Sequence, residues 1–251
     1  MNDSLKKIVS SFAEKAIEHM NNQKSITKCI NLEKDFHEID LLSENGDINI
    51  LHKNDIENAT LRLEITTCNP DNDLFDLSCD NGILKLRPLK NVVDGMDVFL
   101  YLPFRKADTA TLKTDNGTVD VKNIAVNKLK VKASNSKIKL QGVGIEDMKM
   151  RGDNGSVSLE DIYAIGNENL IDCKCRNGRI SLKLRPDDIA SHYIKGELSS
   201  SNGKCIVKLP NLKLKKESGL EFDYGDKTGK CINVKLSSEN DNVKVGVYGQ
   251  E

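Results

Sequence analysis

The sequence predicts an all-β protein: a β-solenoid of 19–25 residues per coil with a short capping α-helix at its N-terminus. Three observations support this prediction. An asparagine, usually followed by glycine, recurs eight times along the 251 residues. Apolar residues stand at the same distances from that asparagine in every copy. Around it, apolar and polar residues alternate, which is the pattern of a strand with one buried face.

The repeat is defined by the asparagine and its flanks. Residues three and five places after the asparagine are apolar in all eight copies, as is the residue four places before it. The residue two places before it is always small. The eight asparagines are Asn45, Asn81, Asn116, Asn135, Asn154, Asn177, Asn202 and Asn240. Each copy therefore predicts a strand, a tight corner with a small inward side chain, and a second strand.

A repeat of this length favours coils that stack and bury one continuous core. Asn and Gly tolerate the left-handed backbone of a corner, and stacked Asn side chains form a hydrogen-bonded ladder from coil to coil. The longer intervals keep strand patterns at residues 59–67, 96–103 and 219–224, which gives about ten or eleven coils. A two-residue hairpin is the alternative for any single Asn-Gly pair, and a layered sandwich is the alternative for the whole set.

The sequence predicts an amphipathic helix over residues 1–25 and the repeat domain over residues 30–251. The apolar face of the helix consists of Leu5, Ile8, Val9, Phe12, Ala16 and Met20. Asp3 or Ser4 is the expected N-cap, and the Asn21-Asn22 pair is the expected stop. We expect the helix to cap the open end of the stack or to form a dimer contact. A membrane-surface helix is the weaker alternative, because its polar face mixes lysine with glutamate.

Composition excludes several classes of partner. The net charge is -1, the charges of the two signs are interspersed, and aromatic residues make up 4% of the chain. We therefore expect no nucleic-acid partner, and membrane association only through the N-terminal helix. The absence of a signal peptide or an apolar span predicts the cytoplasm by default, with the cell envelope as the alternative. The seven cysteines have no framework spacing and are expected to be free thiols.

Candidate metal ligands are better explained by the repeat. Cys173 and Cys175, with Cys79 or Cys205, resemble a soft-metal set, but all four occupy small or apolar positions of the register. We therefore expect no metal and no cofactor. Cys29, Cys68 and Cys231 are not explained in this way, and any of them could be an exposed thiol.

Candidate catalytic groups are also few. Asp80, Asp115 and Asp153 each precede a repeat asparagine and suggest a carboxylate row, which Ser134 and Arg176 interrupt. The four histidines, His19, His37, His52 and His192, lie far apart and have no ligand or triad spacing. The sequence therefore predicts no catalytic residue and no enzyme.

The strings VFLYLP, LKTDNGTVDVKNI, LKVKASNSKIKLQGV and MKMRGDNGSVSLEDI resemble the bacterial putative-adhesin family, a domain of unknown function built of tandem β-strand repeats. Agreement is best over residues 92–210. The resemblance implies a right-handed β-helix-like fold and an adhesin-like role. It brings no catalytic motif, so no site residue is carried over.

Three functional hypotheses follow. The first is a non-catalytic scaffold that binds a protein partner or itself, through loops near residues 88–96, 160–169, 185–193 and 210–230. The second is a β-helix that binds or cleaves polysaccharide. It needs a pair of carboxylates in a cleft or exposed aromatic rings, for which Tyr163, Tyr193 and Tyr224 are the candidates. The third is an envelope-associated protein docked by its N-terminal helix.

Overall fold

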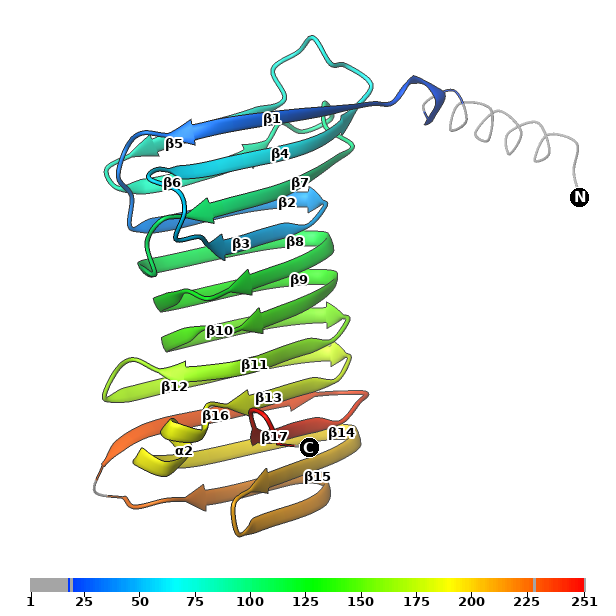
Figure 1. Ribbon diagram of the computed structural model, residues 1–251. Helices are drawn as coiled ribbons and strands as arrows, with labels where there is room; N and C mark the ends of the chain where they lie inside the picture. The colour runs from blue at the N-terminus through cyan, green and yellow to red at the C-terminus, as the bar shows by residue number, and fades with distance from the viewer. Residues whose placement is uncertain (1–17, 19, 228, 251) are drawn as a thin grey trace, which may run out of the picture.

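The computed structural model describes residues 18, 20–227 and 229–250, and it confirms the all-β class (Figure 1). The described residues form 17 strands in one continuous set of pairings, with a short helix, α2, at Pro186–Ser191 between β13 and β14. The strands are β1 Lys24–Leu32, β2 Glu38–Asn45, β3 Ile48–His52, β4 Ala59–Thr67, β5 Phe75–Asp80, β6 Ile83–Pro88, β7 Gly95–Leu102, β8 Lys106–Lys122, β9 Ala125–Gln141, β10 Gly144–Asn154, β11 Val157–Ala164, β12 Glu168–Asn177, β13 Ile180–Leu184, β14 His192–Leu209, β15 Leu212–Tyr224, β16 Lys230–Ser238 and β17 Val243–Val247.

Each central coil has two limbs joined at the asparagine corner. In β8 and β9 one strand runs through the corner without a break, whereas β10 with β11, and β12 with β13, split at it. Neighbouring coils pair in parallel and in register, as Leu112 with Val131 and Val131 with Met150. Parallel pairing at intervals of one coil is not the arrangement of consecutive hairpins, so the hairpin alternative fails for these coils.

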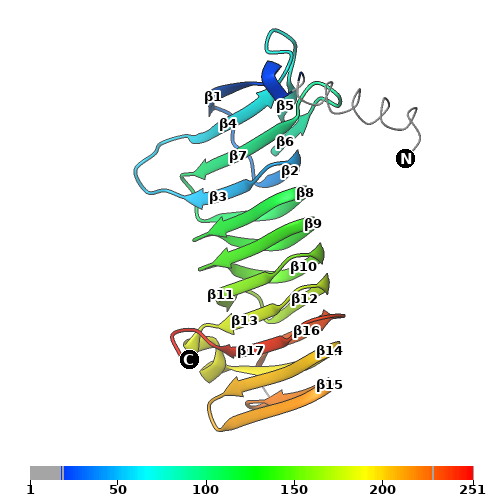
Figure 2. The same cartoon turned by 90° about the vertical axis from the view of Figure 1, so that its right-hand side faces the viewer.

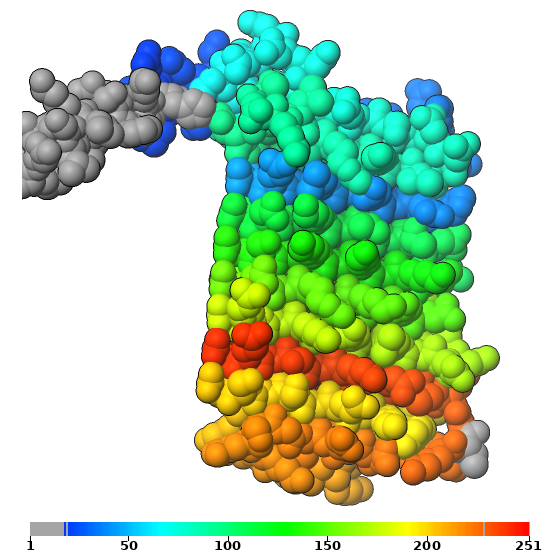
Figure 3. Space-filling model, turned by 180° about the vertical axis from the view of Figure 1, so that it is seen from behind, coloured from blue at the N-terminus to red at the C-terminus, as the bar shows by residue number. Residues whose placement is uncertain are grey.

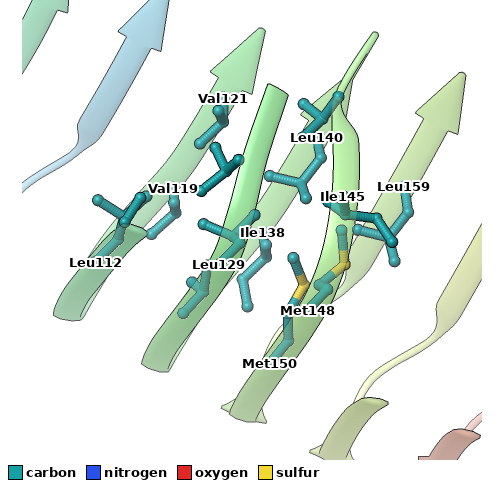
Figure 4. Packing of buried hydrophobic residues seen from close by; sticks show 14 of the residues in the cluster. Leu112, Val119, Val121, Leu129, Ile138, Leu140, Ile145, Met148, Met150 and Leu159 are labelled. Carbon is teal, nitrogen blue, oxygen red and sulfur yellow. The ribbon is translucent and has the colours of Figure 1, made fainter. Parts of the chain in front are cut away.

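The two limbs enclose a single dry core (Figure 4). Leu112 and Met148 on first limbs face Val121 and Leu140 on second limbs, and each of these side chains is at most 1% exposed. Successive residues along a strand alternate between this interior and an outer face. The coil therefore presents two outer faces, one on each limb, that point away from each other.

At the N-terminal end of the stack, the order of the strands in space differs from their order in the sequence. The coil of β2 and β3 pairs with β8. Residues 53–105 lie between these strands in the sequence, but their strands pair on the other side of the β2 and β3 coil, away from β8. Within that segment, β6 and β7 pair with β2 and β3, and β4 pairs antiparallel with both β7 and β1 (Figure 2). The strands β1 and β4, and the hairpin of β5 and β6, form this end.

The C-terminal end shows the same inversion. The last coil, β16 and β17, lies between the coil of β12 and β13 and the strand β14, which precedes it in sequence. In Figure 3 it is the red band between the yellow-green and the gold layers. The hairpin partner β15 pairs antiparallel with β14 and is outermost. The order of the coils in the stack therefore differs from their order in the sequence at both ends. The repeat pattern does not predict this, because all coils share one register and the pattern does not identify neighbours.

Most of the predicted N-terminal helix, residues 1–17 and 19, lies outside the described residues. Residues 20–22 are helical, and the side chain of Met20 is 60% exposed. Strand β1 then begins at Lys24, within the span expected to be helix. Within the part of the chain that the structure describes, no helix is long and apolar enough to cross a membrane.

Candidate functional site

Seven of the eight repeat asparagines form a row of side-chain hydrogen bonds along one edge of the stack. Asn116 Nδ2 donates to Asn45 Oδ1 at 2.7 Å, and Asn135 and Asn154 continue the row at 3.0 and 2.8 Å. Asn177 donates to Asn154 at 2.6 Å. Beyond Asn177 the order is Asn240 and then Asn202, which follows the inserted C-terminal coil. The row is structural, since amide groups bonded to one another hold the corners in register.

Asn81 does not belong to this row. It occupies the turn of the antiparallel hairpin of β5 and β6, with φ of 54° at Asn81 and 75° at Gly82. Two successive positive φ values define a type I′ turn, for which Asn-Gly is the preferred sequence. The ladder prediction was therefore wrong at this position, and the hairpin alternative applies to it.

Glycine at the other corners serves two purposes. The ladder asparagines do not have positive φ, but Gly46, Gly117 and Gly155 after them do, and the backbone of a neighbouring coil also passes close to these glycines. A Cβ on Gly155 would lie 1.9 Å from the Ser136 carbonyl oxygen, and one on Gly117 would lie 2.2 Å from that of Gly46. The small residue before the corner often donates to a neighbouring coil, as Thr114 Oγ1 does to the Gly46 carbonyl at 2.9 Å.

One cluster resembles catalytic machinery, and no spacing in the sequence predicted it. Near α2, Ser191 Oγ lies 3.0 Å from His192 Nδ1, and Asp188 Oδ1 lies 3.7 Å from the same nitrogen. A Ser-His-Asp triad needs serine and aspartate on opposite imidazole nitrogens. Here Nε2 is buried without a partner, and burial raises the pKa of Asp188, which accepts the Ala164 N–H at 2.8 Å. The cluster fastens α2 to β11 and lacks the triad geometry.

The corner carboxylates do not converge. Asp115 accepts a hydrogen bond from Ser134 Oγ at 3.2 Å, and Ser134 lies on the coil between Asp115 and Asp153. Arg176, which interrupts the row, has its Nε 4.0 Å from a carboxylate oxygen of Glu239 on the inserted coil. Asp80 lies in the end hairpin, where its carboxylate forms an ion pair with Lys34. Among the described residues, no group of three or more His, Cys, Asp or Glu side chains could hold a metal ion.

The cysteines follow the register except at the N-terminal end. Cys173, Cys175 and Cys205 are buried, and burial raises the pKa of the Cys173 thiol. Cys79 is only partly buried, because its strand β5 lies at the end of the stack rather than inside a coil. Of the three cysteines that the register did not explain, only Cys29 is exposed.

The candidate aromatic residues do not form a sugar-binding ladder. Arg185 lies 3.9 Å from the ring centroid of Tyr163 and donates two hydrogen bonds to Asp161. The Tyr193 hydroxyl donates to Asp223, and Tyr224 packs partly against the core. The segments expected as loops also differ: 185–193 contains α2, and most of 210–230 is strand β15.

The chain separates its charges along the stack, although its net charge is close to zero. Residues 18–104 carry 16 acidic and 8 basic side chains, a net charge of -8, whereas residues 105–251 carry 20 acidic and 26 basic ones, a net charge of +6. The basic excess centres on β9, which has five exposed lysines and no acidic residue. The neutral total therefore gave the wrong impression of the surface, because it averaged an acidic N-terminal part with a basic remainder of the chain.

Seven of the basic side chains lie together on the outer face of the first limbs, which we name the lysine-rich face. They are Lys113 on β8, Lys128, Lys130 and Lys132 on β9, Lys149 and Arg151 on β10, and Lys174 on β12. Strand register places Lys113, Lys132, Arg151 and Lys174 in one row across four coils, and Lys130 beside Lys149 in the next row. Like charges that face each other on neighbouring strands destabilise a sheet.

Most of these cations have no counter-ion within the protein. Arg151 donates two hydrogen bonds to the Asp172 carboxylate, at 2.6 and 3.2 Å, and Lys149 Nζ lies 3.1 Å from a carboxylate oxygen of Asp147. Lys113, Lys128, Lys130, Lys132 and Lys174 form no ion pair with any described residue. On the opposite face, Lys122 pairs with Asp120 and Lys183 with Glu160, whereas Lys137 and Lys139 form no ion pair with a described residue.

An open groove of about 700 Å³ borders the lysine-rich face. Asn127, Lys128, Glu146, Asp147 and Asn233 are among its lining residues, so amides and carboxylates predominate. A second groove, of about 810 Å³, continues toward β14 and β15 and shares Asp172 and Lys235 with the first. Together the grooves cross successive coils, in the direction of the stack.

The central part of the chain matches a known family. Residues 81–168 match the family model described as Toastrack DUF4097, which confirms for this segment the resemblance to the bacterial putative-adhesin family. The segment includes every residue of the lysine-rich face except Lys174. No curated protein matches the chain.

Several solved structures resemble the chain over most of its length. A putative cell adhesion protein from Clostridium sporogenes has 13% identity and a TM-score of 0.42, covering 89% of this chain and 99% of that chain. A putative adhesin from Bacteroides fragilis has 15% identity and a TM-score of 0.41, covering 89% and 97%. One from Parabacteroides distasonis has 11% identity and a TM-score of 0.42, covering 88% and 97%. Likenesses at this level support no conclusion about what this chain binds.

Proposed function

We propose that this chain is a non-catalytic, adhesin-like binding scaffold, built as the right-handed β-solenoid that the family resemblance implies, and that its lysine-rich face holds the partner. The observation that carries the proposal is the set of five unpaired lysines on a rigid sheet. Stacked like charges cost stability and help no contact inside the protein. A partner with negative charge would remove that cost on binding.

The rest of the molecule supports a role in binding. The core is continuous, and the asparagine row fixes the spacing of the coils, so the lysine ammonium groups stand on a preorganised platform. Preorganisation lowers the entropy lost on binding. The one cluster that resembles a triad lacks the required arrangement around His192.

The test uses the purified chain, fluorescently labelled, and intact bacterial cells, with binding measured by flow cytometry. We expect saturable binding that falls at least about tenfold in the double variant Lys130→Glu/Lys132→Glu, because two of the unpaired cations are reversed. The matched control is Lys137→Glu/Lys139→Glu, on the same strand at the same spacing but on the opposite face. Equal binding by the two variants, or no binding by the unaltered chain, would contradict the proposal.

Two further measurements separate the alternatives. If the purified chain released reducing ends from a polysaccharide, its function would be cleavage of the polysaccharide rather than binding alone. Deletion of residues 1–22 in the same cell assay tests docking by the N-terminal helix. We expect the deletion to leave binding unchanged, whereas loss of binding would favour the helix over the lysine-rich face.

A further inference from the structure

We propose that the partner of the lysine-rich face is a linear anionic polysaccharide that lies along the stack and crosses β8, β9, β10 and β12 in turn. This inference rests on the proposed function and names its ligand class. The arrangement of the cations, the lining of the neighbouring groove and the lack of aromatic and large apolar side chains on the face support it.

The cations form rows that run along the stack. Lys113, Lys132, Arg151 and Lys174 succeed one another from coil to coil, so they are about 4.8 Å apart at the backbone. An extended polysaccharide advances by a similar length per sugar residue. A chain with a carboxylate or sulfate on every sugar, or on every second sugar, therefore meets a cation at each repeat. The regular spacing of the coils produces this match without any special loop.

The groove beside the rows suits a sugar backbone. Asn127 and Asn233 offer amide donors and acceptors, and the carboxylates of Glu146 and Asp147 accept hydrogen bonds from hydroxyl groups. Because these carboxylates repel anionic groups, the charged groups of the ligand would lie on the lysine rows and its hydroxyl groups in the groove. A polymer that carries both anionic groups and hydroxyl groups satisfies the lysine rows and the groove together.

The face lacks the features that other polyanions use. No aromatic residue lies among the residues that define it or line the bordering groove, so bases of single-stranded nucleic acid have no ring on which to stack. The large hydrophobic side chains exposed in the described part of the chain are Met20, Ile83 and Ile165, and none belongs to this face. A membrane surface would therefore find charge there but no apolar residue to insert.

The experiment measures the affinity of the full chain for four probes by fluorescence anisotropy or calorimetry. The probes are alginate, which carries uronates; heparin, which carries sulfates; vesicles of phosphatidylglycerol with phosphatidylcholine; and a single-stranded oligonucleotide. We expect alginate or heparin to bind most tightly, and the binding to weaken as salt is raised. Lys130→Glu/Lys132→Glu should weaken this binding at least about tenfold, and Lys137→Glu/Lys139→Glu less than about threefold.

Folding is controlled independently of binding. Both double variants should remain folded, and Lys130→Glu/Lys132→Glu should raise the urea midpoint slightly, because it removes like charges that face each other on neighbouring strands. Lys130→Gln/Lys132→Gln, which removes charge without reversing it, should bind with intermediate affinity. Equal losses in the two Glu variants would show a nonspecific attraction and would overturn the inference.

The outcomes also separate this inference from the proposed function. If vesicles or the oligonucleotide bind most tightly through the same two lysines, the ligand class is wrong but the binding face stands. If cells bind through this face and none of the probes does so, the ligand class is again wrong. If cells do not distinguish the two double variants, the proposed function itself fails.

Discussion

Each interior asparagine of the corner row donates one hydrogen bond and accepts another. Asn154 donates to Asn135 and accepts from Asn177. Asn154→Ala should therefore lower the free energy of unfolding by about 1–3 kcal/mol, the net contribution of two hydrogen bonds. The measurement is urea unfolding. The control is Asn127→Ala, which removes one exposed hydrogen bond to Asp108 and should cost at most about 1 kcal/mol. Equal losses would mean that the row adds no stability.

The glycine after the corner is required because a neighbouring coil approaches it closely. In Gly155→Ala the new Cβ would lie 1.9 Å from the Ser136 carbonyl oxygen, at a residue whose φ is 144°. We expect a loss of about 2–4 kcal/mol, since the coils must separate to admit it. Gly219→Ala is the control: its Cβ would meet no atom within 4 Å, so stability should be unchanged or slightly raised. Differential scanning calorimetry of the two variants decides the point, and similar melting temperatures would contradict the packing described.

A hydrogen bond between β14 and β15 shifts the titration of both its partners. The Tyr193 hydroxyl holds the pKa of Asp223 below its usual value, while Asp223 raises the pKa of Tyr193 to about 12. A depressed carboxyl pKa stabilises the fold above pH 3.8, and this contribution is lost as the pH falls toward the folded-state pKa. In Tyr193→Phe, NMR titration of the Asp223 carboxyl carbon should show a higher pKa. Tyr163→Phe should leave it unchanged, and no difference between the variants would refute the coupling.

At the scale of elements, the C-terminal coil is an interior part of the stack. Strands β16 and β17 pair on both sides, with β12 and β13 on one side and β14 on the other. Backbone amides in such a position open only with the surrounding coils. Hydrogen exchange measured by mass spectrometry should therefore be as slow over residues 232–236 as over residues 129–133 of β9. Exchange as fast as in the outermost strand β15 would show that the C-terminal coil is not inserted.

Much of the coil could be predicted from the sequence, because burial of alternate residues is a local property. The apolar positions around each asparagine, the small corner residues and the parallel stacking of like positions all follow from the register. The order of the coils could not, since β12 would accept any coil of the same register as its neighbour. Asn81 has the same flanks as the ladder asparagines and differs only in its place, where β5 and β6 close the end as a hairpin.

At the scale of the whole molecule, the distribution of charge matters more than its sum. The candidate binding face was missed because the net charge of -1 was taken to describe the surface. The register contained the signal: Lys113, Lys132, Arg151 and Lys174 each stand three residues before a ladder asparagine. The register does not show which of these basic side chains form ion pairs. Arg151 pairs with Asp172 from the next coil, whereas Lys132 has no such partner.

The central claim is that the unpaired lysines of one face hold the ligand. Lysine footprinting by acylation, read by mass spectrometry with and without heparin, tests it at each residue. We predict that Lys113, Lys128, Lys130, Lys132 and Lys174 become less reactive when heparin is bound, while Lys137 and Lys139, on the opposite face of the same strand, do not change. Equal protection of both faces, or protection of Lys137 and Lys139 alone, would contradict the claim.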